Sequence, residues 1–397
     1  MRQPGHGWWS ITPTPVLMWL FEKPDWQSRK VWDEIESRLP SWYLPGRIHD
    51  WMLSQAMGWL GPGRVDSDRA LGVWTLGRLG ARGNELEAVL AATADESPGV
   101  RVVAIRAMRA AHVPFEFVMP VARRVLDEQE RSGEERRWLF ELLLGYVKEL
   151  PPSDVDYLRG AALRIVKAES GDEGAAAAGL LGRLQPLPEA MIDELISLLE
   201  GDKAADNVRW YSVEEALGRC GPRAARAVPI LIKRLGSGPT WNYITVIQAL
   251  GRMGTPAAAA ASVLGKLASS TQLPPDECIH AEAARLAVLG KQPSLLDAYL
   301  SMLDDPDAGV RKGALYAMGH LGDGDLGPAR ARVELVLSDP DAEVRSVALF
   351  ILSWMGRDAE PSLPAIEGVR RSDPIEGVRE AAKAAEDEIG RAVYMAR

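Results

Sequence analysis

Residues 305–322 read DPDAGVRKGALYAMGHLG, and residues 339–356 read DPDAEVRSVALFILSWMG. The two segments begin 34 residues apart, and their opening returns in residues 372–387 as SDPIEGVREAAKAAED. Self-similarity at a fixed period of about 20–50 residues is typical of proteins built from stacked structural repeats. The sequence therefore predicts a repeat protein.

The same pattern continues toward the N-terminus. The position of the arginine in the V-R dipeptide serves as the marker of a unit, and ten units are found at equivalent positions, Arg69, Arg101, Arg137, Gly174, Trp210, Tyr243, Glu282, Arg311, Arg345 and Arg379. These positions lie on average about 34 residues apart, which is the length of one helical hairpin with its turns. Each unit is therefore expected to be one hairpin.

Within a unit the patterns are helical. In residues 310–321 the apolar and small side chains recur at intervals of three and four, the spacing of one helix face. The segments LGRLG (76–80), LGRCG (217–221) and LGRMG (250–254) close such patterns with glycine, which tolerates the left-handed conformation just past a helix end. Alternating runs typical of strands are missing. The predicted fold class is all-α, a right-handed α-α superhelix of about ten hairpins.

A hairpin whose second helix opens with D-P-D-x-x-V-R and closes with A-L-G-x-x-G resembles the HEAT repeat. It is similar to the short bacterial repeats of the phycobilin-lyase type, and the resemblance covers roughly residues 47–390. The resemblance implies an α-solenoid whose second helices line the concave face. It also implies a protein that holds other macromolecules, although the fold alone does not decide the activity.

The resemblance further implies a ladder of charged pairs between adjacent repeats. An aspartate precedes the marker arginine by six residues in four units, which gives the pairs Asp95 and Arg101, Asp305 and Arg311, Asp339 and Arg345, and Asp373 and Arg379. The aspartate ends the turn between two helices, where it can also accept backbone amides. We expect these eight residues to be structural. The units near residues 174, 210, 243 and 282 lack the pair, so the ladder is not expected to be continuous.

Three domains are predicted: a tryptophan-rich N-terminal cap over residues 1–46, a repeat array over 47–374, and a C-terminal capping helix over 375–397. Eight of the 13 tryptophans precede residue 60. Tryptophan covers a large area, so the N-terminal segment is interpreted as a cap that seals the first hairpin. An exposed aromatic docking surface is the alternative interpretation.

The composition restricts the partners. A formal net charge of −9 and a pI near 5.3 have the wrong sign for a protein that neutralises duplex phosphates, so nucleic acid is not expected. Two cysteines are too few for a disulfide scaffold or a four-thiolate zinc site. The apolar stretch 16–21 is shorter than the ~20 residues of a membrane span. We predict a cytoplasmic protein without a membrane partner, and the sequence predicts no oligomeric state.

The sequence offers no catalytic, metal-binding or cofactor-binding set. Its five histidines lie in separate units, and no phosphate-binding, dinucleotide-binding or zinc-hydrolase fingerprint occurs. Deoxyhypusine hydroxylases, which are built on related repeats, hold two irons with His-Glu dipeptides, and this chain has none. The predicted function is a non-enzymatic scaffold that binds a polypeptide on its concave face, without a cofactor. The alternative is a repeat-fold enzyme of the alkylpurine DNA glycosylase or phycobilin lyase type.

One repeat position favours a cation. The residue after the closing glycine is basic in six units, at Arg78, Arg183, Arg219, Arg252, Lys291 and His320. Because equivalent positions align in a solenoid, we predict a basic line that binds an acidic or aromatic-containing polypeptide segment. Trp74, Tyr211 and Tyr316, at second-helix positions expected to be exposed, are the aromatic anchors expected beside it. The alternative is that each cation only stabilises the negative end of a helix dipole, by about 0.3–1 kcal/mol.

Overall fold

The computed structural model describes residues 46–128, 130–169, 171–200, 207–237, 243–321 and 326–395. Throughout these ranges the regular structure is helical and no strand occurs. The chain divides into two compact units, one ending at Leu142 and the other beginning at Leu143. The helices of the first unit are α3 (Gly46–Trp59), α4 (Asp66–Leu79), α5 (Asn84–Ala92), α6 (Pro98–Ala110), α7 (Phe115–Asp127) and α8 (Gly133–Leu143), the last of which ends at the division.

The second unit continues with paired helices. Its α-helices are α9 (Pro152–Ala168), α10 (Gly171–Arg183), α11 (Glu189–Glu200), α12 (Asn207–Arg219), α13 (Val228–Ser237), α14 (Tyr243–Met253), α15 (Ala261–Ala268), α16 (Pro275–Val288), α17 (Leu295–Met302), α18 (Ala308–Gly319), α19 (Arg330–Leu335), α20 (Ala342–Trp354), α21 (Leu363–Ser372) and α22 (Glu376–Met395). Short 3₁₀ segments are η2 (Leu144–Glu149), η3 (Gly221–Ala227), η5 (Thr255–Ala260), η7 (Gly327–Ala329), η8 (Val336–Ser338) and η9 (Gly356–Ser362).

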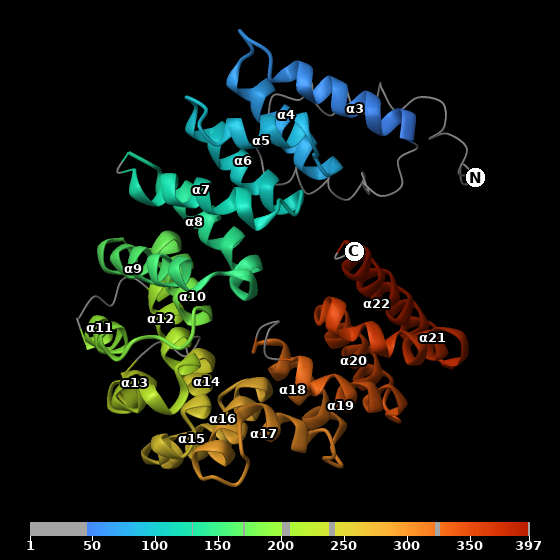
Figure 1. Cartoon of the computed structure of the whole chain (residues 1–397). Coiled ribbons are helices and arrows are strands. Elements are labelled where there is room, and N and C mark those ends of the chain that lie inside the picture. Colours follow the sequence, from blue (N-terminus) through green and yellow to red (C-terminus); the bar gives the residue numbers. More distant parts are fainter. Residues whose placement is uncertain are drawn as a thin grey trace. The chain divides into compact units, whose positions relative to one another are not determined.

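The even-numbered helices are the second helices of the hairpins. The ten marker positions of the sequence fall one each in α4, α6, α8, α10, α12, α14, α16, α18, α20 and α22. In the second unit each even-numbered helix from α10 to α22 contacts the next one. Figure 1 shows these second helices as an inner row, with the odd-numbered helices of this unit outside. The prediction of an all-α helical repeat fold of the superhelix class is confirmed.

The D-P-D segments determine where second helices begin. Their second aspartate is the N-cap. Asp307 Oδ1 accepts the Gly309 amide at 2.7 Å before α18. Asp341 Oδ1 accepts the Glu343 amide at 2.8 Å before α20. A side-chain oxygen at this position satisfies amide protons that have no partner within the helix.

The two glycines of the L-G-R-x-G endings have different roles. The last one ends the helix with a positive φ, +59° at Gly221 and +65° at Gly254, a conformation that glycine adopts at little cost. The first one lies inside the helix, where a Cβ atom on Gly218 would be 2.7 Å from the Cα of Ala249 in the next second helix. Glycine therefore lets neighbouring second helices approach backbone to backbone. Similar approaches occur at Gly77 against Ala107, Gly182 against Ala216 and Gly251 against Ala284.

The predicted domain boundaries differ from the division into units. The tryptophan-rich segment 1–46 lies outside the described residues except for Gly46, which begins α3; its two interpretations stay predictions. The division after Leu142 falls within the predicted repeat array rather than at an end of it. The predicted C-terminal helix corresponds to α22, which buries Val378 and Ile389.

Candidate functional site

Arginine–aspartate rungs join consecutive repeats at the C-terminal end. Arg311 of α18 binds Asp339 of the next repeat with two bonds, Nε to Oδ2 at 2.7 Å and Nη2 to Oδ1 at 2.8 Å. Arg345 of α20 binds Asp373 in the same way, at 2.7 and 3.0 Å. Parallel two-bond pairs of this kind are among the strongest polar contacts in proteins. The rungs therefore fix the spacing of the last three second helices.

Each rung also builds the turn of its own repeat. The third nitrogen of the arginine donates back to the carbonyl six residues earlier, as Arg345 Nη1 does to Asp339 O at 2.8 Å. Asp373 Oδ1 accepts the amide of Ile375 at 2.9 Å. The bond from Arg345 lowers the pKa of Asp373, and the bond from Arg311 does the same for Asp339. The carboxylates are thus held in their charged form.

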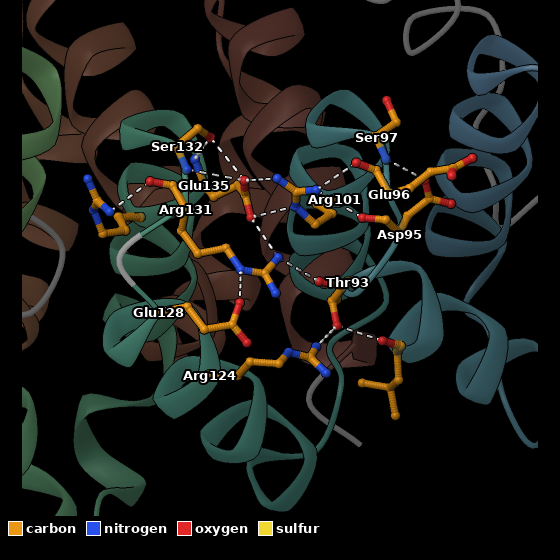
Figure 2. A network of polar contacts seen from close by, with 12 residues as sticks. Thr93, Asp95, Glu96, Ser97, Arg101, Arg124, Glu128, Arg131, Ser132 and Glu135 are labelled. Carbon is orange, nitrogen blue, oxygen red and sulfur yellow. Dashed lines mark hydrogen bonds and ion pairs between the residues drawn. The ribbon is translucent and has the colours of Figure 1, made fainter.

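The first unit has equivalent rungs with one replacement. Arg69 binds Asp95 through two bonds of 2.9 Å. Arg101 binds Glu135 of α8 at 3.0 and 2.9 Å. Figure 2 shows Glu135 between the guanidinium groups of Arg101 and Arg131, both of which donate to it. Although burial of Glu135 opposes the shift, these two arginines lower its pKa. A glutamate therefore replaces the aspartate of the rung.

The predicted pairs need one correction. The aspartate and the arginine six residues later do not bind each other through their side chains. Arg101 contacts Asp95 only at its carbonyl, at 2.9 Å, and Arg311 contacts Asp305 likewise, at 2.8 Å. The reason is geometric: the aspartate side chain points back to the preceding repeat, where Arg69 holds Asp95. Arg379 likewise donates to the carbonyl of Asp373, at 2.7 Å.

The middle repeats contain buried polar groups of other kinds. Glu214 of α12 is fully buried and accepts a 2.5 Å bond from Arg234 Nε. Burial raises the pKa of the Glu214 carboxyl to about 7, although Arg234 favours the carboxylate. Glu214 Oε2 and His280 Nε2 are among the buried polar atoms of the described residues that have no hydrogen-bond partner. An unsatisfied buried polar atom costs about 1–3 kcal/mol.

A second buried cluster surrounds Tyr299 of α17. Nδ1 of His280 in α16 lies 2.7 Å from the Tyr299 hydroxyl, and both side chains are fully buried. Burial lowers the pKa of His280 to about 3, and the nearby His320 adds to this shift. Burial also raises the pKa of Tyr299, and Arg252 and Gln248 offset part of this rise. The histidine is therefore neutral at ordinary pH.

Two of the predicted binding arginines contact one carbonyl. Arg219 of α12 and Arg252 of α14 donate from Nη2 to Leu321 O, at 3.1 and 3.0 Å. Leu321 lies two residues after the end of α18 and next to its C-cap His320, so two cations lie near the negative end of a helix that is distant in sequence. We call this contact the Leu321 clasp. The helix-dipole alternative concerned the end of each arginine's own helix, so it stays a prediction.

The other predicted binding residues belong to several helices of both units. Arg78 and Trp74 lie in α4 of the first unit, whereas Arg183 ends α10 of the second. Trp74, expected to be exposed, has only 8% of its surface exposed, because α4 packs against α3, α5 and α6 together. Tyr211 is half-buried. Tyr316 is exposed, at 46%.

A groove that sequence reasoning missed lies between α20 and α22. Its cavity volume is about 800 Å³. One wall carries Phe350 and Trp354, whose rings are 4.8 Å apart and which are 45% and 48% exposed. The other wall is mostly alanine, with Ala381, Ala384, Ala385 and Ala392. We call this the α20–α22 groove.

The repeat register contains the signal for this groove. Five residues after the marker arginine stand Tyr316, Phe350 and Ala384, and nine residues after it stand His320, Trp354 and Glu388. Aromatic residues thus recur at one face of consecutive second helices, and the last repeat replaces them with an alanine and a glutamate. The smaller side chains of α22 open the space that the aromatic residues of α20 border.

The described residues contain no group of three or more His, Cys, Asp or Glu side chains placed to hold a metal ion. None of the described helices is long and apolar enough to cross a membrane.

Comparison with known proteins yields one family. A family model described as HEAT repeats matches residues 296–386, and no curated protein matches the sequence. Among solved structures the chain is similar to the crystal structure of Kap121p, with a TM-score of 0.43 and 16% identity. That match covers 91% of this chain and 43% of Kap121p, so the chain spans less than half the length of that protein. A crystal structure of an engineered protein has a TM-score of 0.41 and 16% identity, covering 85% of this chain and 98% of that one.

The stacked hairpins define a helical repeat protein. The family match covers the part from α17 into α22, where the rungs Arg311–Asp339 and Arg345–Asp373 lie. Residues 296–386 match HEAT repeats, as the sequence predicts, and the described helices before them form hairpins of the same pattern.

Proposed function

We propose that the protein is a scaffold that binds a polypeptide partner on its second-helix layer. The observation that carries this proposal is the exposure of three large aromatic side chains, Tyr316, Phe350 and Trp354, on consecutive second helices. Aromatic side chains contribute much of the binding energy in protein interfaces. Two of them, Phe350 and Trp354, line the α20–α22 groove, which supports a binding surface rather than scattered exposed residues.

The lining of the groove supports binding over catalysis. Alanine, leucine and aromatic side chains form most of it, and they offer a partner contact area rather than a reacting group. Its ionisable lining residue is Glu388, which lies 2.9 Å from Arg391. A catalytic site needs several titratable groups that converge on one reacting atom, and this lining has no such set.

The predicted acidic partner remains a hypothesis for the arginines. Arg219 and Arg252 already donate to Leu321 O, so an acidic segment would compete with that contact. Arg183 shares their position in the repeat and stays a candidate. A cytoplasmic location is likewise a prediction from composition.

Affinity capture tests the proposal. The full chain and the double variant Phe350→Ser/Trp354→Ser are used to capture proteins from a lysate of the native organism, which mass spectrometry then identifies. Leu335→Ser is the matched control, because Leu335 is 65% exposed on α19, outside the groove lining. We expect polypeptides that the wild type and the control retain and the double variant loses. Identical sets from all three folded proteins would refute the proposal.

A further inference from the structure

The shape and the chemistry of the groove point to one class of partner. We infer that the α20–α22 groove binds an amphipathic helix of another polypeptide, with basic residues beside its apolar stripe. This inference rests on the proposed function and adds the conformation and the charge of the partner.

The groove has the dimensions of a short helix. Its α22 wall runs from Ala381 to Ala392, which at 1.5 Å per residue corresponds to about 16 Å, or three helical turns. Phe350 and Trp354 stand four residues apart on the facing wall, so they form a ridge of the kind that fits between side chains of a packed helix. Alanine on the opposite wall allows a third helix to approach to about 8–10 Å.

Hydrogen bonding favours a helix over an extended segment. An extended peptide brings backbone amides and carbonyls that need partners when they are buried. The hydroxyls of the lining belong to Ser346 and Ser353, and Ser353 Oγ already donates to Phe350 O at 2.7 Å. A helix satisfies its backbone internally, so a groove with few side-chain hydroxyls accepts it at lower cost.

The charge around the groove favours a basic partner. Glu388 lines the groove, and Glu380 and Asp387 are exposed on the same helix. Arg391 binds Glu388 at 2.9 Å and offsets one of these charges, but α22 as a whole carries five acidic and three basic residues. Cationic side chains flanking the apolar stripe of a partner would therefore be attracted here. This expectation is opposite in sign to the acidic segment predicted for the arginine line.

The test uses model peptides and the full chain. One fluorescein-labelled peptide is an amphipathic helix of about 14 leucine and lysine residues, a second replaces lysine with glutamate, and a third keeps the leucine–lysine composition but contains central prolines that break the helix. Fluorescence anisotropy gives the dissociation constants. We expect the leucine–lysine helix to bind at least about tenfold more tightly than the other two. Phe350→Ser/Trp354→Ser should weaken this binding about tenfold, and Leu335→Ser should not.

The outcomes separate the inference from the proposed function. If the double variant loses captured proteins but binds the leucine–lysine peptide as the wild type does, the groove binds partners but not as inferred. If the glutamate or the proline-containing peptide binds equally well, the inferred charge or conformation is wrong. A dimer in sedimentation that the double variant dissociates would assign the groove to a second copy of the chain and overturn the inference.

Discussion

The last repeats and the middle repeats hold similar stacks together by different contacts. From α18 to α22 the second helices share the rungs Arg311–Asp339 and Arg345–Asp373. From α10 to α16 the described residues show no such rung. Glycine meets alanine there at each step, as at Gly218 and Ala249, and the buried polar groups differ from repeat to repeat.

The difference shows that the hairpin stack does not depend on one kind of contact. A rung repeats the same two residues at each step, so the last repeats resemble one another closely. A glycine–alanine contact constrains only size, which leaves other positions free to diverge. Glu214 and His280 occupy second helices of the divergent region, and both are fully buried there.

The largest expected effect concerns the glycine contacts. Gly218→Leu forces side-chain atoms into the backbone of α14, because even a Cβ would lie 2.7 Å from Ala249 Cα. We expect a loss of roughly 3 kcal/mol or more in the free energy of unfolding, measured by urea denaturation with circular dichroism. Gly160→Ala is the control: nothing lies within 4 Å of its Cβ position in α9, so it should stabilise by about 0.5–1 kcal/mol. A loss below about 1 kcal/mol for Gly218→Leu would show that the helices move apart easily.

The rungs come next. Arg345→Ala leaves the buried carboxylate of Asp373 without its ion partner, so we expect a loss of about 3 kcal/mol in the same measurement. Arg332→Ala is the matched control, since Arg332 also binds an aspartate 28 residues away, Asp304, but through exposed side chains. This control should cost at most about 0.5 kcal/mol. Equal losses for the two variants would mean that burial does not strengthen the rung.

Two buried groups of the middle repeats should give opposite pH dependence. The folded-state pKa of His280, about 3, lies below its ordinary 6.5, so the unfolded chain binds the extra proton and stability is lost as pH falls. The folded-state pKa of Glu214, about 7, lies above its ordinary 4.5, so its contribution is lost as pH rises. Between about pH 5 and 7 each contribution changes by about 2 kcal/mol, in opposite directions.

Single substitutions separate the two contributions. Relative to the wild type, Glu214→Gln should make unfolding free energy rise more steeply from about pH 5 to 7, by about 2 kcal/mol. His280→Asn should shift the slope in the opposite direction by a similar amount. Urea denaturation at both pH values measures these slopes. Parallel slopes in all three proteins would contradict the assigned pKa shifts.

The smallest effect is expected at the Leu321 clasp. Because two arginines share one carbonyl, Arg219→Ala or Arg252→Ala alone should cost about 1 kcal/mol, and the double variant more than either. Hydrogen exchange should become faster in peptides from residues 308–321. A loss of captured proteins with unchanged stability and exchange would instead support the basic binding line predicted from the sequence.

The period and the helix pattern were sufficient to predict the fold. The near-identical segments at 305 and 339 establish the register, and each of the ten marker positions lies in its own second helix. Burial was harder to predict. Arg311 stands off the apolar stripe of its helix and yet is only 8% exposed, because the Asp339 carboxylate of the next repeat covers it.

The candidate sites depended on contacts that a period does not specify. The Leu321 clasp joins residues 102 and 69 positions apart, which requires knowledge of how successive hairpins turn relative to one another. Trp74 was assigned to an exposed face because one helix pattern does not tell how many neighbours surround the helix. The α20–α22 groove forms because α22 has no aromatic side chain at the repeat position of Phe350. Its residue there, Ala384, is noticeable only when the repeats are aligned.

The rungs also determine how this array can change in length. Each is divided between two repeats, an arginine on one side and an aspartate on the other. Excision of residues 339–372, one period of 34, would place Asp373 at the 28-residue separation from Arg311 that Asp339 now occupies. Because each rung uses the same two residue types, recombination can add or remove a whole repeat and still leave an arginine opposite an aspartate. The middle repeats each have their own buried partners, so removing one would leave these partners unmatched. Related chains should therefore differ in repeat number in the C-terminal part.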